Sequence, residues 1–116
     1  MRVRDLISVC DGRGELCKVT EEIRREAIPG LIQDEEQGKN RAILFENVKG
    51  YKVPVLANLY GTLERYALGL NVDPAAIWES IDNAIARPAE VVRANEAPCF
   101  EVVYDEPDIT KILPLI

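Results

Sequence analysis

The chain has 116 residues, of which 47% are hydrophobic and 29% charged, and its formal net charge at pH 7 is −6. This length and composition predict one folded domain over residues 1–116 and exclude a disordered chain, because enough apolar surface is available to offset chain entropy. The acidic balance argues against nucleic acid as a partner, and the lack of an apolar run of about 18 residues argues against a membrane span, so we expect a cytoplasmic protein.

The first forty residues predict short helices around one strand. The expected elements are a helix over 4–12, a strand over 15–20, a helix over 21–28 and a second short helix over 31–38. Gly12 and Gly14 end the first helix, because glycine accepts the left-handed conformation of a helix cap. Pro29 breaks the later helical pattern, since its ring clashes with the preceding turn.

Two strands follow, separated by a turn at 49–52. Residues 42–48 (AILFENV) are rich in branched and aromatic side chains, which is typical of a strand. Residues 53–59 (VPVLANL) predict the second strand. Pro54 cannot donate a ladder hydrogen bond, so we expect it at an edge or at the start of that strand.

Two helices with clear start signals come next. Thr62 can cap the first of them. The apolar stripe of this helix is formed by Leu63, Tyr66, Ala67 and Leu70. Asp73 followed by Pro74 predicts the start of the second helix, because proline in the first turn forfeits no internal hydrogen bond. Apolar residues then recur with the helical period over 77–85, and Pro88 ends the pattern.

Residues 98–105 (PCFEVVYD) predict a last, half-buried strand. Phe100, Val102 and Tyr104 alternate with Glu101 and Val103, which matches the two-residue period of a strand. With this strand the chain is expected to be an α+β domain, in which helices cover a small mixed β-sheet of about four strands.

No set of residues in the chain predicts a self-contained active site. There is no histidine, which excludes histidine-based triads and histidine-ligated zinc. Cys10, Cys17 and Cys99 lack metal-ligand or redox spacing and are expected to be small core residues in a reducing compartment. The acidic runs at 21–22 and 34–36 are read as solvated helix faces, since neighbouring helical residues point in different directions.

Two groups of residues are candidates for contact with a partner. Glu46, Asn47 and Asn58 are polar residues inside apolar strands, where burial costs free energy unless they are bonded. They line a groove or contact a partner, or they bond nearby backbone at the strand ends. The second group is the apolar tail, Ile112, Leu113, Leu115 and Ile116. This tail either docks on a partner or folds back on its own sheet.

The segments 42–50 (AILFENVKG) and 51–61 (YKVPVLANLYG), followed by the helix start at 63–65 (LER), resemble the N-terminal region of the UbiD-type carboxy-lyases. The opening residues 4–6 (RDL) and 12–16 (GRGEL) and the closing stretch 101–114 also resemble that region. The resemblance therefore spans nearly the whole chain, and FENVKG together with PVLANLYG is specific as a pair.

This resemblance implies reversible, non-oxidative decarboxylation of aromatic or α,β-unsaturated acids with prenylated FMN, a divalent metal and potassium. The family's catalytic arginine and glutamates and its metal ligands lie in a split-barrel domain after the leucine–proline motif. None of those positions has a counterpart here, and Glu46 and Arg65 belong to the matching motif without corresponding to them. The resemblance therefore assigns no catalytic, cofactor-binding or metal-binding residue to this chain.

Three functions are compatible with these observations. The first is a non-catalytic module, either a subunit or a fragment, that docks on a UbiD-type catalytic chain holding the cofactor and metals. The second is a piece of a full decarboxylase whose activity resides elsewhere. The third is a standalone homo-oligomeric interaction or small-ligand-binding protein that kept only the fold.

Overall fold

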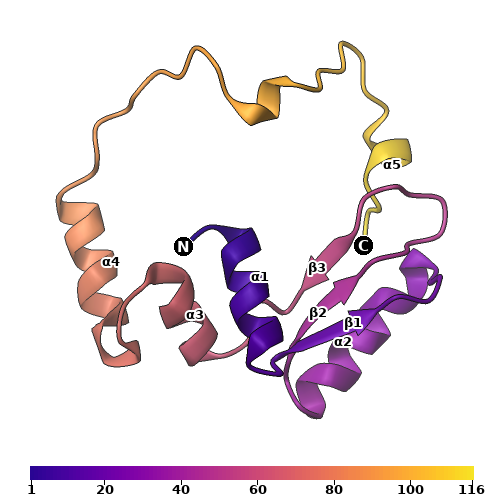
Figure 1. Ribbon diagram of the computed structural model, residues 1–116, viewed down its shortest axis with the longest axis horizontal. Helices are drawn as coiled ribbons and strands as arrows, with labels where there is room; N and C mark the ends of the chain where they lie inside the picture. The colour runs from indigo at the N-terminus through magenta and orange to yellow at the C-terminus, as the bar shows by residue number, and fades with distance from the viewer.

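Helices and strands alternate over the first sixty residues, and helices and loops make up the rest (Figure 1). The computed structural model describes residues 1–116. Its helices are α1 (Val3–Gly12), α2 (Ile28–Gln37), α3 (Leu63–Leu70), α4 (Ile77–Ala86) and α5 (Ile109–Ile112). Its strands are β1 (Leu16–Val19), β2 (Ala42–Phe45) and β3 (Val55–Ala57). Short 3₁₀ turns are η1 (Arg25–Ala27), η2 (Pro74–Ala76) and η3 (Pro98–Phe100).

The three strands form one mixed sheet in the order β1-β2-β3. β1 and β2 are parallel, with Leu16 opposite Ala42, and α2 provides the crossover that a parallel connection requires. β2 and β3 are antiparallel, with Phe45 opposite Val55. The predicted α+β class and mixed sheet are confirmed, with three strands in place of about four.

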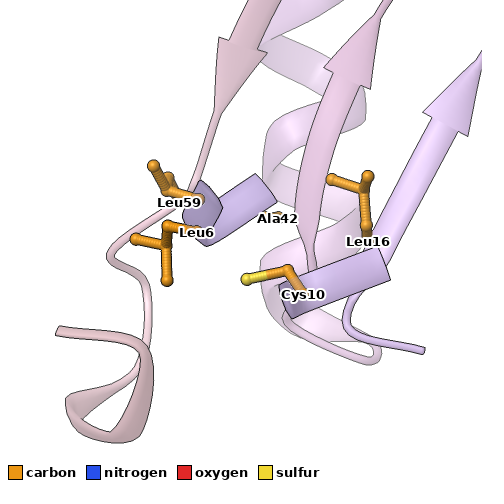
Figure 2. Close-up of a cluster of buried hydrophobic side chains, with 5 residues drawn as sticks. All are labelled: Leu6, Cys10, Leu16, Ala42 and Leu59. Atoms are coloured by element: carbon orange, nitrogen blue, oxygen red, sulfur yellow. The ribbon is translucent and has the colours of Figure 1, made fainter. Parts of the chain in front are cut away.

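Both faces of β2 are buried, and two apolar clusters lie on either side of it. One cluster joins α1 to the sheet and contains Leu6, Cys10, Leu16, Ala42 and Leu59 (Figure 2). The other joins α2 to the sheet and contains Ile28, Ile43, Phe45 and Val48. A strand covered on both faces has a continuous apolar run rather than an alternating pattern, which explains the sequence of residues 42–45.

The three cysteines differ in environment. Cys10 lies in the α1 cluster, where burial raises the pKa of its thiol, so this side chain is an unreactive core residue as expected. Cys17 is half-buried, and Cys99 is exposed. The expectation of a core position was therefore wrong for Cys99.

Pro29 begins a helix where we predicted that it breaks one. Residues 21–24 are not helical, and Ile23 forms a parallel bridge with Val48. One 3₁₀ turn, η1, then leads into α2, whose first turn contains Pro29. The predicted helix over 21–28 was therefore wrong, because proline is tolerated in a first turn whose N–H groups have no helical partner.

The start signals of the two later helices are confirmed. The Thr62 hydroxyl accepts a hydrogen bond from the Arg65 amide at 3.2 Å, and the Asp73 carboxylate accepts one from the Ala75 amide at 2.9 Å. By contrast, the predicted strand over 98–105 is wrong, because η3 and irregular chain occupy it and no strand pairs with it. The alternation of apolar side chains predicts which residues would share a face of a strand, but a strand also needs a neighbouring strand to which it is hydrogen-bonded.

The buried Arg65 side chain joins four parts of the domain. Its guanidinium donates to the carbonyls of Leu59 at 3.0 Å, Asn40 at 2.8 Å and Asn58 at 3.1 Å. The Glu15 carboxylate lies 3.7 Å from the same group. Arg65 is only 2% exposed, so these acceptors replace the water that its charge would otherwise require.

Two asparagines and a glycine shape the site that receives this guanidinium. Asn40 and Asn58 both have left-handed backbones, with φ of 51° and 52°. Asparagine tolerates this conformation better than most residues, and here it turns both carbonyls toward Arg65. The Asn58 amide also donates to the Asn40 side chain at 2.8 Å, and a Cβ on Gly61 would lie 1.9 Å from the Asn58 side-chain oxygen. The NLYG motif, residues 58–61, therefore forms a loop that binds the Arg65 guanidinium.

Replacement of Arg65 by methionine is expected to destabilise the domain by about 3–5 kcal/mol, because it leaves buried carbonyls and the Glu15 carboxylate without their cation. Urea unfolding measures this change. Arg4→Met, on an exposed position of α1, is the control and is expected to change stability by less than about 0.5 kcal/mol. Similar losses for the two variants would contradict the role assigned to Arg65.

Replacement of Gly61 by alanine is expected to destabilise the domain by about 1–3 kcal/mol, because the added methyl group displaces the Asn58 side chain. Gly30→Ala is the matched control. Gly30 lies in α2 with open space around it, so alanine there is expected to be neutral or stabilising by about 0.5–1 kcal/mol. Thermal unfolding of both variants measures the contrast, and equal shifts would argue against a close approach at Gly61.

An ion pair at the end of α2 makes stability depend on pH. The Arg41 guanidinium donates two hydrogen bonds to Glu35, at 2.7 and 3.0 Å, and they hold the pKa of Glu35 below its usual value. A carboxylate with a lowered folded-state pKa stabilises the fold above its unfolded pKa of about 4.3, and the contribution is lost as the pH falls through the folded-state value.

Glu35→Gln is therefore expected to unfold at a lower urea concentration than the parent chain at neutral pH. The difference between the two proteins should shrink as the pH falls below about 4, where Glu35 becomes protonated. Glu36→Gln, at the exposed neighbouring position, controls for the general loss of a negative charge. A difference that stays constant over this pH range would contradict the assignment.

Candidate docking surface

The first and second halves of the chain differ sharply in burial. Of the 12 buried residues, all but Arg65, Ala67 and Ile77 lie within residues 1–59. Of the 19 large hydrophobic residues that are exposed, all but Met1, Val3 and Leu31 lie within residues 60–116. The first half therefore holds the core, and the second half presents apolar side chains to solvent.

The size of the exposed surface shows the same imbalance. The chain exposes 9102 Å², whereas a compact monomer of this mass exposes about 6,300 Å². Its radius of gyration is 17.0 Å, against about 13 Å for a compact domain of this length. The excess area of about 2,800 Å² is larger than the roughly 800 Å² that each partner contributes to a standard protein interface.

α3 and α4 present part of this apolar surface. Residues Leu63, Tyr66 and Leu70, from the predicted stripe of α3, are exposed, while Arg65 and Ala67 face the core. Of the four stripe residues, only Ala67 is buried. On α4, Ile77 is buried but Trp78 and Ile85 are 72% and 74% exposed. These helices have apolar faces that their own domain does not cover.

The segment after α4, residues 87–108, forms an extended arm. In Figure 1 it arches away from the helices and strands and returns at α5. Its backbone makes only local turn hydrogen bonds, such as those within η3. α5 follows the arm, and the Tyr51 hydroxyl donates a hydrogen bond at 3.0 Å to the Thr110 carbonyl in α5. This bond connects the end of the arm to the body of the domain, which comprises the sheet with α1 and α2. The arm is therefore held at its two ends and carries exposed apolar residues between them.

The structure does not bring the seven predicted contact residues together. Glu46 and Asn47 are exposed after the end of β2, and Asn58 lies at the opposite end of that strand. The Asn58 amide donates to the Arg41 carbonyl at 2.9 Å and supports the Arg65 site. Its side chain therefore bonds nearby groups, which was the alternative reading at a strand end.

The predicted apolar tail follows the Tyr51 contact. Ile112 is half-buried, while Leu113, Leu115 and Ile116 are exposed. This tail thus belongs to the exposed apolar surface, together with α3, α4 and the arm. Trp78 and the stripe of α3 were not among the predicted contact residues. The sequence did contain a signal for them: it has more helices with an apolar stripe than one three-stranded sheet can cover.

A cavity of about 400 Å³ lies between the body and the start of the tail. It is lined by Arg24, Arg25, Lys49 and Lys111 together with Glu26, Gly50, Tyr51 and Thr110. Two of its cations have anionic partners, since Arg25 pairs with Glu26 at 3.0 Å and Lys111 with Asp108 at 3.1 Å. Hydrogen bonds from its own backbone amide and from Arg25 lower the pKa of Glu26, and hydrogen bonds from Thr110 and Lys111 lower the pKa of Asp108. These ion pairs are exposed and contribute little to stability.

The chain has neither a cluster of metal-ligating side chains nor a buried polar side chain without a partner. No group of three histidine, cysteine, aspartate or glutamate side chains lies close enough to hold a metal ion. Every buried side-chain nitrogen and oxygen already has a hydrogen-bond partner, so none is left to receive a phosphate or a ring nitrogen. We therefore assign no step of a reaction to side chains of this chain. No helix is long and apolar enough to cross a membrane.

Comparison with known proteins gives one family over most of the chain. The family model for the 3-octaprenyl-4-hydroxybenzoate carboxy-lyase N-terminal domain matches residues 7–85. A phenolic acid decarboxylase of Sedimentibacter hydroxybenzoicus is 33% identical over 97% of this chain. The chain covers 26% of that relative, and thus spans about a quarter of its length.

Solved structures agree with this match. An evolved dimeric form of the UbiD-class enzyme HmfF from Pelotomaculum thermopropionicum, in complex with prenylated FMN, superposes with a TM-score of 0.81 at 30% identity. The match covers 96% of this chain and 26% of that one. The vanillic acid decarboxylase of Sedimentibacter hydroxybenzoicus in its open form gives a TM-score of 0.70 at 33% identity, with the same shares covered.

Proposed function

This chain belongs to the UbiD family through its N-terminal domain, and from that membership we propose that it is a non-catalytic docking module of a UbiD-type carboxy-lyase. It packs against a catalytic part that carries out the decarboxylation of aromatic or α,β-unsaturated acids. In this proposal the catalytic part holds prenylated FMN with a divalent metal and potassium. This chain supplies a folded shell and an apolar surface.

The observation that carries the proposal is the exposed apolar surface of residues 60–116. The chain exposes about 2,800 Å² more total surface than a compact monomer, and the apolar part of that excess costs about 25 cal/mol per Å² in water. A partner that covers it recovers this free energy. About three-quarters of each relative's chain lies outside the matched part, which is enough protein to cover a surface of this size.

The same surface also supports a second function. Two copies of this chain could cover each other's α3 and α4, which would give a homo-oligomeric interaction module of the family fold. The two functions differ in which protein covers the apolar surface. In the first function a catalytic part covers it, and in the second function another copy of the same chain covers it.

The test is co-expression of this chain, carrying an affinity tag, with the phenolic acid decarboxylase of Sedimentibacter hydroxybenzoicus lacking its matched N-terminal quarter. We expect a stoichiometric complex that releases carbon dioxide from a phenolic acid once supplied with prenylated FMN and metal. The tagged chain alone is expected to release none. Decarboxylation by the chain alone, or a stable homodimer that ignores the catalytic part, would contradict the proposal.

Trp78, the single tryptophan of the chain, provides an internal probe and a matched pair of variants. Its fluorescence is expected to be quenched by acrylamide in the free chain, since the side chain is 72% exposed, and protected in the complex. Trp78→Ser should weaken the complex by about tenfold or more, as expected for a buried aromatic anchor. Glu79→Ser, at the exposed neighbouring position, should leave affinity within about twofold.

A further inference from the structure

We propose that residues 100–104 of the arm, which form no strand in the free chain, become a β-strand that is added to the edge of a sheet in the catalytic part, at a place flanked by lysine or arginine side chains. This inference rests on the proposed function and specifies one contact of it. The observations that carry it are the unused backbone groups of the arm, the alternation of its side chains and its concentration of negative charge.

The backbone of this segment has no long-range partner in the chain. Beyond η3 and up to Asp108, no backbone N–H donates a hydrogen bond to another element. Peptide groups of this kind pair with the exposed edge of a sheet when an extended segment is added as a strand. The arm can adopt this conformation without breaking the body, because only its two ends are attached to it.

The side chains of the segment suit a strand with one buried face. Phe100, Val102 and Tyr104 would lie on one face, and Glu101, Val103 and Asp105 on the other. Aromatic and branched residues are also those with the strongest preference for strands. In the chain alone the apolar set has no core to enter, since Phe100, Val102 and Tyr104 are 58%, 66% and 59% exposed.

Charge specifies the chemistry of the receiving edge. Residues 94–110 contain five acidic residues, Glu96, Glu101, Asp105, Glu106 and Asp108, and no lysine or arginine. This segment therefore carries nearly all of the net charge of −6. Basic side chains beside the receiving strand would be attracted to it, whereas a second copy of the same segment would be repelled.

The chain's own sheet is a less suitable acceptor. β3 is only three residues long and follows Pro54, and it has no charged residue to pair with the acidic segment. β1 offers Lys18, but this side chain already pairs with Asp11 at 2.5 Å. A separate edge in the catalytic part therefore fits the charge pattern better than either free edge of this sheet.

Two variants test the inference in the complex described above. Val102→Asp places a charge on the face that becomes buried and is expected to weaken binding to the truncated Sedimentibacter decarboxylase by about tenfold or more. Val103→Asp adds the same charge at a comparably exposed position on the opposite face and is expected to stay within about twofold. Both sites are exposed in the free chain, so the body should fold equally well in each variant.

Hydrogen exchange gives a second readout that does not depend on activity. Amides of residues 100–104 should exchange quickly in the free chain, and alternate amides should become protected in the complex. Raising the salt from about 0.05 to about 0.5 M should weaken the complex, because it screens the acidic segment. If a complex forms but these amides stay unprotected and the two variants bind alike, the strand inference is wrong while the docking proposal stands. If no complex forms, the docking proposal itself fails.

Discussion

The position of the Arg65 guanidinium is the constraint on which the domain depends. It binds carbonyls from the loop before β2 and from the loop after β3, and it faces the carboxylate that precedes β1. All of these groups lie at the same end of the sheet, where a three-stranded sheet has few ladder hydrogen bonds to hold its loops. A buried guanidinium is stable only when its N–H groups are hydrogen-bonded. The loops that carry the acceptor carbonyls are therefore held in one conformation, more tightly than apolar packing would hold them. Together with the buried Ala67 and the half-buried Leu68, the Arg65 side chain anchors α3 to the rest of the domain.

This anchor also explains the orientation of α3. Because Arg65 must reach the carbonyls beneath the helix, the side that carries Arg65 and Leu68 turns inward, and Leu63, Tyr66 and Leu70 are left outside. The orientation of α3 therefore explains both the hydrogen bonds of Arg65 and the exposure of the helix's apolar side chains. Most of the buried side chains lie in the first half of the chain, and the apolar side chains of the second half remain exposed.

The sequence alone was sufficient for the helix caps, the mixed sheet and the strands near 42–48 and 53–59, because each depends on local chemistry or on a continuous apolar run. The sequence alone was insufficient where one residue is compatible with two different local structures. Pro29 can end a helix or begin one, and only the bridge between Ile23 and Val48 decides. The stripe of α3 was predicted, but apolar periodicity identifies an apolar face of a helix without showing whether the same domain covers it. Arg65 was recognised as part of a motif, but its burial needed the left-handed asparagines that only the folded chain reveals.

The arm that follows α4 has one more consequence, for the fate of the chain inside a cell. Proteases cleave extended peptide bonds that can enter their active sites, and residues 87–108 offer such bonds with no hydrogen bonds to a neighbouring element to open first. A chain without its counterpart would be degraded from this segment while its core is still intact. If the chain docks on a catalytic part as proposed, its abundance would follow the supply of that part, because unassembled copies would be degraded.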